Sequence, residues 1–268
     1  MLCAAGCDEI DPPYMTNVDG HHGNDGARTV LLEEFTGHQC PNCPEGSQIA
    51  HQLAEHYGNR LVIVSVHAGW FASPAPPLFE YNFRTSAGND LHDYFGVAHY
   101  PVGMVSRKPF EGSMLMAPSA WAEAIERLIH TNADFELRLT SQYRETDRML
   151  EVSADVAALS DSGCPYRISV CLTESGIIKP QRTNNPDYPD GVIADYEHNH
   201  VLRACINGTW GEPLNEGPIL AGDRLEHSYT ISVDEEWEPG NLTVVAYIHH
   251  ADTYEVAQAA AIPCVPGQ

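Results

Sequence analysis

Apolar positions in the first half of the chain follow two different patterns. Residues 29–35 and 61–66 are short, mostly apolar runs, which is typical of strands that are buried on both faces. Between them, apolar residues recur every three or four positions from Glu45 to Tyr57, and Gly58 follows directly. The pattern therefore predicts a strand, a helix that ends near Gly58, and a second strand.

A long insertion separates these elements from the next ones. It covers residues 68–100, and it includes the stiff Pro-rich stretch 73–77 and a short predicted helix near 89–95. Three elements are then expected: a short strand at 102–106, a weakly marked partner strand at 108–112, and a helix opened by Pro118.

From residue 134 onward, apolar and polar residues alternate, which is the period of half-buried strands. The strand-like segments are 135–139, 150–156, 168–172, 201–206, 227–233, 242–249 and 256–262. Short strands with turn-rich joints predict an antiparallel sandwich, with a domain boundary near Asn132. The loop at 176–200 is too long for a simple connection, and we interpret it as a candidate contact surface.

Composition narrows the functional classes. Hydrophobic residues make up 43% of the 268-residue chain, so a sizeable core is expected. The formal net charge of -23 repels phosphate backbones, so no nucleic-acid partner is predicted. The sequence contains no uninterrupted apolar run of about 18 residues, so we expect membrane attachment by a lipid anchor only.

The N-terminus suggests where that anchor is. Small residues lead into Cys7, and this stretch resembles a bacterial lipobox, in which the cysteine becomes lipidated. The acidic run 8–11 resembles the export signal of Bacteroidetes surface lipoproteins. We therefore interpret residues 1–28 as a lipoprotein signal remnant and a flexible tether. The alternative is an ordinary N-terminus with two stray thiols.

The candidate chemistry is a Cys-x-x-Cys between the first strand and the first helix. Cys40 and Cys43 have the spacing used in thiol-disulfide exchange, and a helix N-terminus stabilises a thiolate there. The order strand, Cys-x-x-Cys, helix, strand, insertion, X-Pro strand, helix is that of a thioredoxin fold. In that fold the X-Pro bond is cis and lies against the disulfide, so Pro101 is predicted to be part of the site.

Three hypotheses about function follow from this motif. In a thiol-disulfide oxidoreductase, Cys40 is the nucleophile, Cys43 resolves the intermediate and Pro101 shapes the substrate groove. A protonated His38 would support the thiolate, and the alternative is a loop histidine that points to solvent. In a non-catalytic binding protein, Cys40–Cys43 is a structural disulfide. A third reading is metal capture by the two cysteines with His38 or His67, although a second ligand pair is missing. No cofactor and no metal are predicted.

Four further cysteines lie in the second half of the chain. Cys171 has the opposite parity to Ile168 and Val170, so it is expected to face away from them. Structural disulfides Cys171–Cys205 and Cys164–Cys264 are expected, although four cysteines allow three pairings and buried free thiols are the alternative. Scattered cysteines of this kind favour an oxidising compartment.

Several stretches together resemble the outer membrane protein 28-related family of Bacteroidetes. They are VLLEEFTGHQCPNCP (30–44), VSVHAG (64–69), YPVGMV (100–105), HNHVLR (198–203) and NGTWGE (207–212). The resemblance implies an outer-membrane lipoprotein, surface-exposed or periplasmic. It also implies a thioredoxin-like α/β domain at 29–132, followed by an all-β, immunoglobulin-like sandwich at 133–268. The expected partners are envelope or extracellular proteins.

Overall fold

The computed structural model describes residues 26–265, and the expected lipidation site Cys7 and the acidic run after it lie outside this range. Residues 26–132, called the first segment below, contain β1 (Val30–Thr36), β2 (Leu61–His67) and β3 (Val102–Val105). β1 pairs with β2 in parallel and with β3 in antiparallel orientation. All three strands are buried along their whole length, as their continuous apolar runs predicted.

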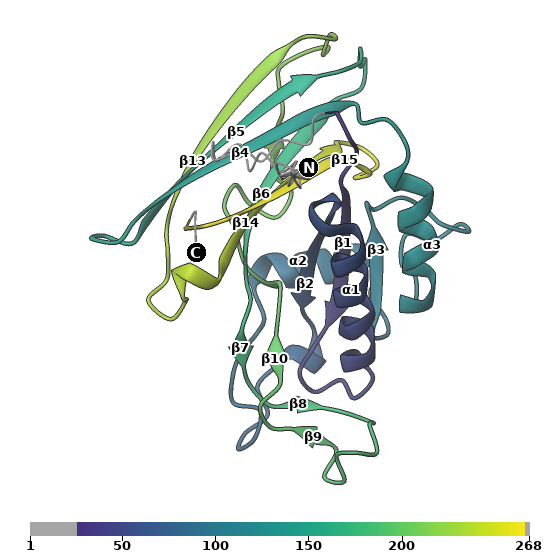
Figure 1. Ribbon diagram of the computed structural model, residues 1–268, viewed down its shortest axis with the longest axis vertical. Helices are drawn as coiled ribbons and strands as arrows, with labels where there is room; N and C mark the ends of the chain where they lie inside the picture. Colours follow the sequence, from purple (N-terminus) through teal and green to yellow (C-terminus); the bar gives the residue numbers. More distant parts are fainter. Residues whose placement is uncertain (1–25, 266–268) are drawn as a thin grey trace, which may run out of the picture.

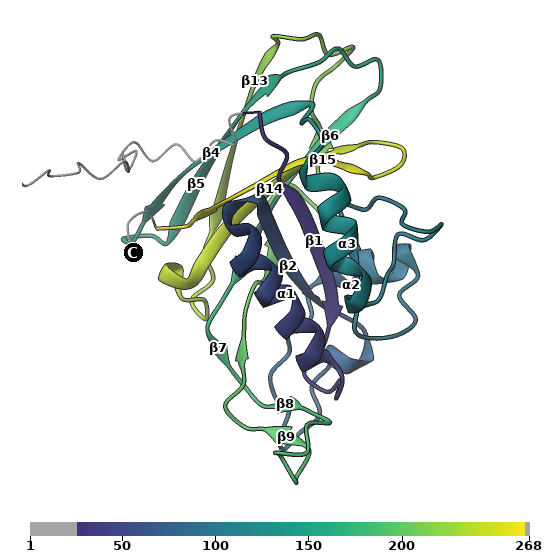
Figure 2. The ribbon, with the colours of Figure 1, turned by 45° about the vertical axis from the view of Figure 1, so that its right-hand side comes forward.

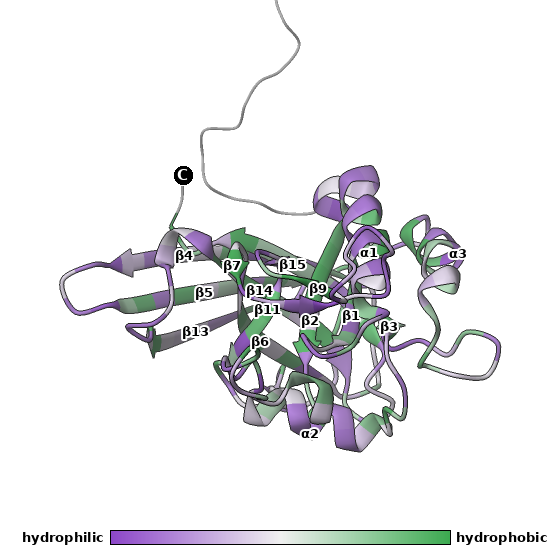
Figure 3. Ribbon diagram, turned by 90° about the horizontal axis from the view of Figure 1, so that it is seen from below, coloured by the Kyte–Doolittle hydropathy of each residue, from purple (hydrophilic) through white to green (hydrophobic). Residues whose placement is uncertain are grey.

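Helices cover both faces of these strands. α1 (Cys43–Tyr57) and α3 (Pro118–Ile129) lie on one face, and α2 (Ser86–Phe95) lies on the other, as Figure 3 shows from below. α1 and α3 each have a proline in the first turn, where its missing N–H costs no hydrogen bond. The predicted helices near 45–57, 89–95 and from Pro118 are thereby confirmed.

One sequence-based prediction in this segment was wrong. Residues 108–112 were expected to form a strand, but they form a turn closed by a hydrogen bond from the Ser113 N–H to the Phe110 carbonyl. Glu111 and Gly112 have positive φ angles of 52° and 90°, which a strand does not allow.

Residues 133–265, called the second segment below, form two layers of antiparallel strands. A three-stranded sheet contains β13 (Arg224–Ser232), β5 (Met149–Ala158) and β4 (Phe135–Arg144), in that order. It packs against β15 (Val256–Pro263), β14 (Leu242–His250) and β6 (Tyr166–Glu174), and the two layers enclose an apolar cluster. Figures 1 and 2 show the three-stranded sheet above the rest of the molecule.

The two segments contribute strands to one long sheet. Its order is β15-β14-β6-β11-β2-β1-β3, and the short β12 (Glu212–Pro213) pairs with β6 off this path. The junction is β11 (Val201–Cys205), which pairs with β6 in antiparallel orientation and with β2 in parallel, where Val201 is opposite Ser65. Strands from both sides of residue 132 thus hydrogen-bond in one sheet, and the architecture is mixed α/β.

An arm of residues 175–200 leaves the long sheet between β6 and β11. It is built from two pairs of very short strands: β7 (Ile177–Ile178) with β10 (Glu197–His198), and β8 (Gln181–Arg182) with β9 (Val192–Ile193). Figure 1 shows the arm extending along the body to the start of α1. This is the long loop that the sequence marked as a contact surface, and in the structure it contacts the chain itself.

The four cysteines of the second segment are free thiols in the structure, whereas two disulfides were expected. Cys164 is exposed, and Cys264 is buried in the apolar cluster between the two layers of strands. Because one thiol faces solvent and the other faces the core, the expected Cys164–Cys264 bridge is not formed. Cys171 does face away from Ile168 and Val170, as its parity predicted, and it packs in a different apolar cluster.

Candidate functional site

The site is built around a disulfide between Cys40 and Cys43. β1 ends at Thr36, a tight loop follows, and Cys43 is the first residue of α1. The loop needs glycine at position 37, because a Cβ there would lie 2.5 Å from the backbone carbon of Phe71. The disulfide is thus held at the point where a buried strand passes into a helix N-terminus, whose N–H groups and dipole stabilise negative charge.

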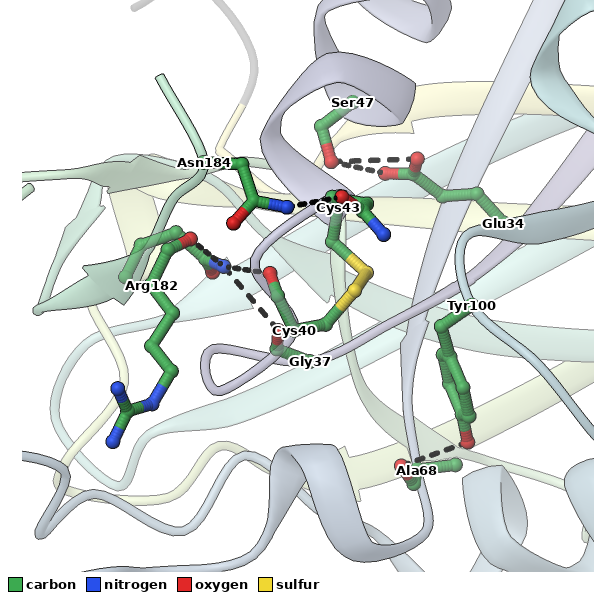
Figure 4. Close-up of a disulfide and its surroundings, with 11 residues drawn as sticks. Glu34, Gly37, Cys40, Cys43, Ser47, Ala68, Tyr100, Arg182 and Asn184 are labelled. Carbon is green, nitrogen blue, oxygen red and sulfur yellow. Dashed lines mark hydrogen bonds between the residues drawn. A yellow bond between two sulfur atoms is a disulfide. The ribbon is translucent and has the colours of Figure 1, made fainter. Parts of the chain in front are cut away.

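Both cysteines are almost completely covered, each with 1% of its surface exposed. The arm covers them from one side, as Figure 4 shows. The Gln181 side-chain amide donates to the Cys40 carbonyl at 2.9 Å. The Arg182 N–H donates to the His38 carbonyl at 2.8 Å, and the Asn184 N–H donates to the Pro41 carbonyl at 3.0 Å. The arm therefore occupies the backbone hydrogen-bonding positions beside the disulfide.

Pro101 lies against the first turn of α1. The Tyr100–Pro101 peptide bond is cis, as the predicted fold required. A Cβ placed on Gly46 would come within 2.9 Å of the Pro101 Cβ, so the proline ring packs directly on the helix one turn after Cys43. The Tyr100 hydroxyl donates to the Ala68 carbonyl at 3.0 Å, which ties the proline loop to the end of β2.

A buried carboxyl group lies on the α1 side of the disulfide. Glu34 is on β1, and it accepts a hydrogen bond from Ser65 at 2.6 Å and weaker ones from Ser47 at 3.3 and 3.4 Å. Ser47 is one helical turn after Cys43, so Glu34 lies beneath the first turns of α1 (Figure 4). Burial raises the pKa of Glu34, and its two hydroxyl partners oppose that shift.

The histidines near the disulfide are neutral groups in an aromatic environment. His38 is 1% exposed, between Phe79 and Phe83, and its Nε2 donates to the Ser73 carbonyl at 2.9 Å. Burial lowers the pKa of His38, so it does not supply the imidazolium that the sequence suggested. Burial also lowers the pKa of His67 well below its ordinary value.

A polar cleft of about 700 Å³ opens between α1 and the arm. Its lining includes Glu34, Ser65 and His67 from the strands, and Asn42, Asn184 and His198 from the loop before α1 and from the arm. His198 is 3% exposed, and burial lowers its pKa to about 3. His67 and His198 therefore face the cleft as neutral hydrogen-bonding groups, and Glu45 and Glu197 add carboxyl groups to its lining.

Within residues 26–265, no group of three or more His, Cys, Asp or Glu side chains is placed to hold an ion. Over the same range, none of the helices has the length and apolar character needed to cross a membrane.

The structure brings Cys40, Cys43 and Pro101 to one place, and sequence analysis had singled out all three. Sequence analysis marked the loop at 176–200 as a whole, but it did not single out Glu34 or the individual arm residues Gln181 and Asn184. The acidic pair at positions 33 and 34 within a buried strand was a signal for the first. The contacts of Gln181 and Asn184 had no local signal, because they join positions about 140 residues apart.

The chain is similar to one known protein family and to several solved structures. A family model described as outer membrane protein Omp28 matches residues 88–262. The structure of HBP35 of Porphyromonas gingivalis has a TM-score of 0.64 at 19% identity, covering 88% of this chain and 75% of that one. A structure from Agrobacterium tumefaciens has a TM-score of 0.54 at 11% identity, covering 90% and 97%.

A domain of the outer membrane lipoprotein Omp28 from Porphyromonas gingivalis has a TM-score of 0.34 at 19% identity, covering 48% of this chain and 87% of that one. None of the curated proteins matches the chain.

Proposed function

Because the chain belongs to the outer membrane protein Omp28 family, we propose that it is a cell-envelope lipoprotein that exchanges disulfides with envelope proteins through Cys40 and Cys43. The observation that carries this proposal is the disulfide at the junction of β1 and α1, with Cys43 as the first helical residue. That position favours the thiolate form, which is the reactive species in exchange.

The proposed fold assignment is a thioredoxin-like unit followed by an immunoglobulin-like sandwich. The order β1, Cys-x-x-Cys, α1, β2, β3, α3, with a cis proline before β3, supports the first part. The two layers of antiparallel strands around one apolar cluster support the second part.

Reduction of a substrate disulfide needs Cys40 and Cys43 in their dithiol form, whereas the disulfide form seen in the structure is the one that oxidises a substrate dithiol. The Cys40 thiolate attacks one substrate sulfur, the substrate S–S bond breaks, and the other substrate sulfur leaves and takes a proton. The Cys43 thiolate then attacks the Cys40 sulfur, which restores Cys40–Cys43 and releases the second substrate thiol. Two electrons pass to the substrate, and the reverse sequence oxidises a dithiol.

In this scheme we assign the ionised form of Glu34 as the acceptor of the Cys43 thiol proton. It lies beneath the helix turn that follows Cys43, and its raised pKa brings a carboxyl group closer to neutral pH. Pro101 packs on the same turn and holds the helix start in place. The substrate reaches the sulfurs when the arm moves away, because Gln181, Arg182 and Asn184 occupy the adjacent carbonyls.

A non-catalytic interaction protein is the second candidate, and the burial of both cysteines favours it. Under this hypothesis the disulfide and the arm hold the loop before α1 in place, and the cleft beside α1 is the binding surface. Glutathione redox buffers separate the two candidates. A structural bridge stays oxidised at potentials near -250 mV, whereas an exchange site equilibrates with the buffer.

A trapping variant tests the exchange function directly. Cys43→Ser keeps the nucleophile but cannot resolve the mixed disulfide, so we expect it to accumulate disulfide-linked adducts at Cys40 with envelope proteins. Cys40→Ser is the matched control and should accumulate none. The exchange proposal is refuted when Cys43→Ser captures no protein and the wild type reduces no model disulfide.

The envelope location has its own test. The family name supports a location at the outer membrane, on its surface or its periplasmic side, and the stretch around Cys7 supports lipid attachment there. We expect Cys7→Ser to release the protein from the membrane fraction. Protease treatment of intact cells distinguishes the two faces, since only a surface-exposed chain is digested. A Cys7→Ser protein that stays in the membrane fraction would exclude the anchor.

A further inference from the structure

Two cysteines that the proposed exchange reaction does not use lie directly opposite each other. Cys171 on β6 is the ladder partner of Cys205, the last residue of β11. The neighbouring pair is joined by a hydrogen bond from the Ile206 N–H to the Val170 carbonyl at 2.7 Å. Cys171 and Cys205 therefore occupy a non-hydrogen-bonded position of the antiparallel ladder, where opposite Cα atoms are about 4.5 Å apart.

This register suits a disulfide. Bridged cysteines have Cα atoms about 4.4–6.8 Å apart, a range that includes a non-hydrogen-bonded pair. Both side chains also project from the same face of the sheet, into the apolar cluster that contains Val245 and Tyr247. Cys171 is buried and Cys205 is partly exposed, so a reagent reaches the pair through Cys205.

Cys171 and Cys205 are free thiols in this structure, and we infer that oxidation joins them in a cross-strand disulfide that closes the base of the arm. β6 ends at Glu174 and β11 begins at Val201, and the arm is the chain between them. A bond between positions 171 and 205 ties together the two strands from which the arm emerges. The strand register thus selects the Cys171–Cys205 bond, and Cys164 and Cys264 stay free because one is exposed and the other lies in the core.

The bond forms by two exchange steps with a low-molecular-weight disulfide as the oxidant. The Cys205 thiolate attacks one sulfur of the oxidant, whose S–S bond breaks, and the first oxidant thiol leaves with a proton. The Cys171 thiolate then attacks the Cys205 sulfur and displaces the second oxidant thiol, which takes the other proton. Two electrons pass to the oxidant for each Cys171–Cys205 bond.

The surroundings favour slow exchange. Burial raises the pKa of Cys205 to about 12 and raises that of Cys171 well above its ordinary value. A small thiolate fraction slows both steps of formation. Thiols of raised pKa are also poor leaving groups when a reductant attacks, so the bond is expected to persist once formed. This distinguishes the pair from Cys40 and Cys43, which lie at a helix N-terminus.

Peptide mapping tests the inference on the full chain. The protein is incubated with glutathione disulfide, unfolded, alkylated with N-ethylmaleimide and digested without reductant, and the peptides are identified by mass spectrometry. We expect a Cys171–Cys205 cross-linked peptide, with Cys164 alkylated. Alkylation of both Cys171 and Cys205 after oxidation, or their linkage to other cysteines, would overturn the inference. The result does not depend on turnover at Cys40 and Cys43.

Single variants test the order of attack. Cys171→Ser should retain glutathione on Cys205, because the resolving thiol is missing. Cys205→Ser should leave Cys171 unmodified in the folded protein, and the matched control Cys164→Ser should form the cross-link normally. Glutathione on Cys171 in the folded Cys205→Ser protein would refute the proposed order.

Hydrogen exchange tests the role at the base of the arm. The Arg182 and Asn184 amides donate to the His38 and Pro41 carbonyls, so their exchange reports whether the arm is seated. We expect severalfold slower exchange across residues 176–200 in the oxidised wild type than in Cys205→Ser. Equal rates would show that the bond does not restrain the arm.

Discussion

Glu34 is a carboxyl group inside a strand that is buried along its whole length, and hydroxyls of Ser65 and Ser47 are its hydrogen-bond partners. A buried carboxylate without a cation nearby is costly, so the protonated form is favoured relative to solution. The adjacent Glu33 does have a cation as its partner, because Arg107 donates two hydrogen bonds of 2.7 Å to its carboxylate. Two neighbouring glutamates thus have different partners because their side chains point to opposite faces of β1.

Glu34 predicts a specific pH dependence of stability. Its folded-state pKa is raised above the ordinary 4.5, so its contribution is fully present below pH 4.5 and is lost as pH rises through the folded pKa. Between pH 4.5 and 8, the unfolding free energy of the wild type should fall more than that of Glu34→Gln. Urea denaturation at each pH measures this, with the exposed Glu235→Gln as control. Parallel curves for wild type and Glu34→Gln would contradict the prediction.

At the scale of elements, the arm is the structure that controls access to the disulfide. Its strands contain only two residues each, so most of its attachment comes from the hydrogen bonds that it makes to the loop before α1. Such an element opens at lower free energy than the long sheet does.

Weakening the arm should expose the disulfide. Gln181→Ala removes the side-chain hydrogen bond to the Cys40 carbonyl, which is worth about 1 kcal/mol and corresponds to an about fivefold larger open population. We expect the Cys40–Cys43 bond to be reduced about fivefold faster by a water-soluble phosphine, measured by thiol labelling. Asp190→Ala, on the exposed part of the arm, should react at the wild-type rate. Equal rates for Gln181→Ala and wild type would mean that the arm is not the barrier.

At the scale of the whole molecule, the two segments are joined by strand pairing and by buried side-chain contacts. The β2–β11 pairing continues one sheet across them. Arg107, which is fully buried, pairs with Glu33 in the first segment and donates to the Tyr247 hydroxyl in the second at 3.0 Å. The Thr29 N–H also donates to the Gln258 side chain at 2.8 Å. These contacts predict that both segments unfold together.

Arg107 is the side chain whose loss should reveal this coupling. Arg107→Met leaves Glu33 buried without its cation, so we expect a loss of about 3–5 kcal/mol in unfolding free energy. Replacing Glu33 with Gln in the same protein should recover part of that loss. Lys108→Ala, which breaks a neighbouring exposed ion pair, should cost no more than about 1 kcal/mol. Similar losses for Arg107→Met and Lys108→Ala in urea denaturation would refute the assigned role.

The sequence alone determined the features that depend on neighbours in the chain. The apolar runs predicted β1 and β2, helical spacing predicted α1 and α3, and alternation predicted the strands after residue 134. The spacing of Cys40 and Cys43 between a strand and a helix located the disulfide, and parity placed Cys171 away from Val170. Local backbone geometry controls each of these, so a short window of residues is sufficient.

Tertiary structure decided what lies beside those elements. β11 pairs with β2, and the arm covers Cys40. Glu33 is paired with Arg107, whereas Glu34 has hydroxyl partners. His38 likewise became a buried neutral ring. The physical reason is common to all four. Strand partners, burial and pKa depend on residues that are distant in the chain, and no local periodicity specifies which distant surfaces will meet.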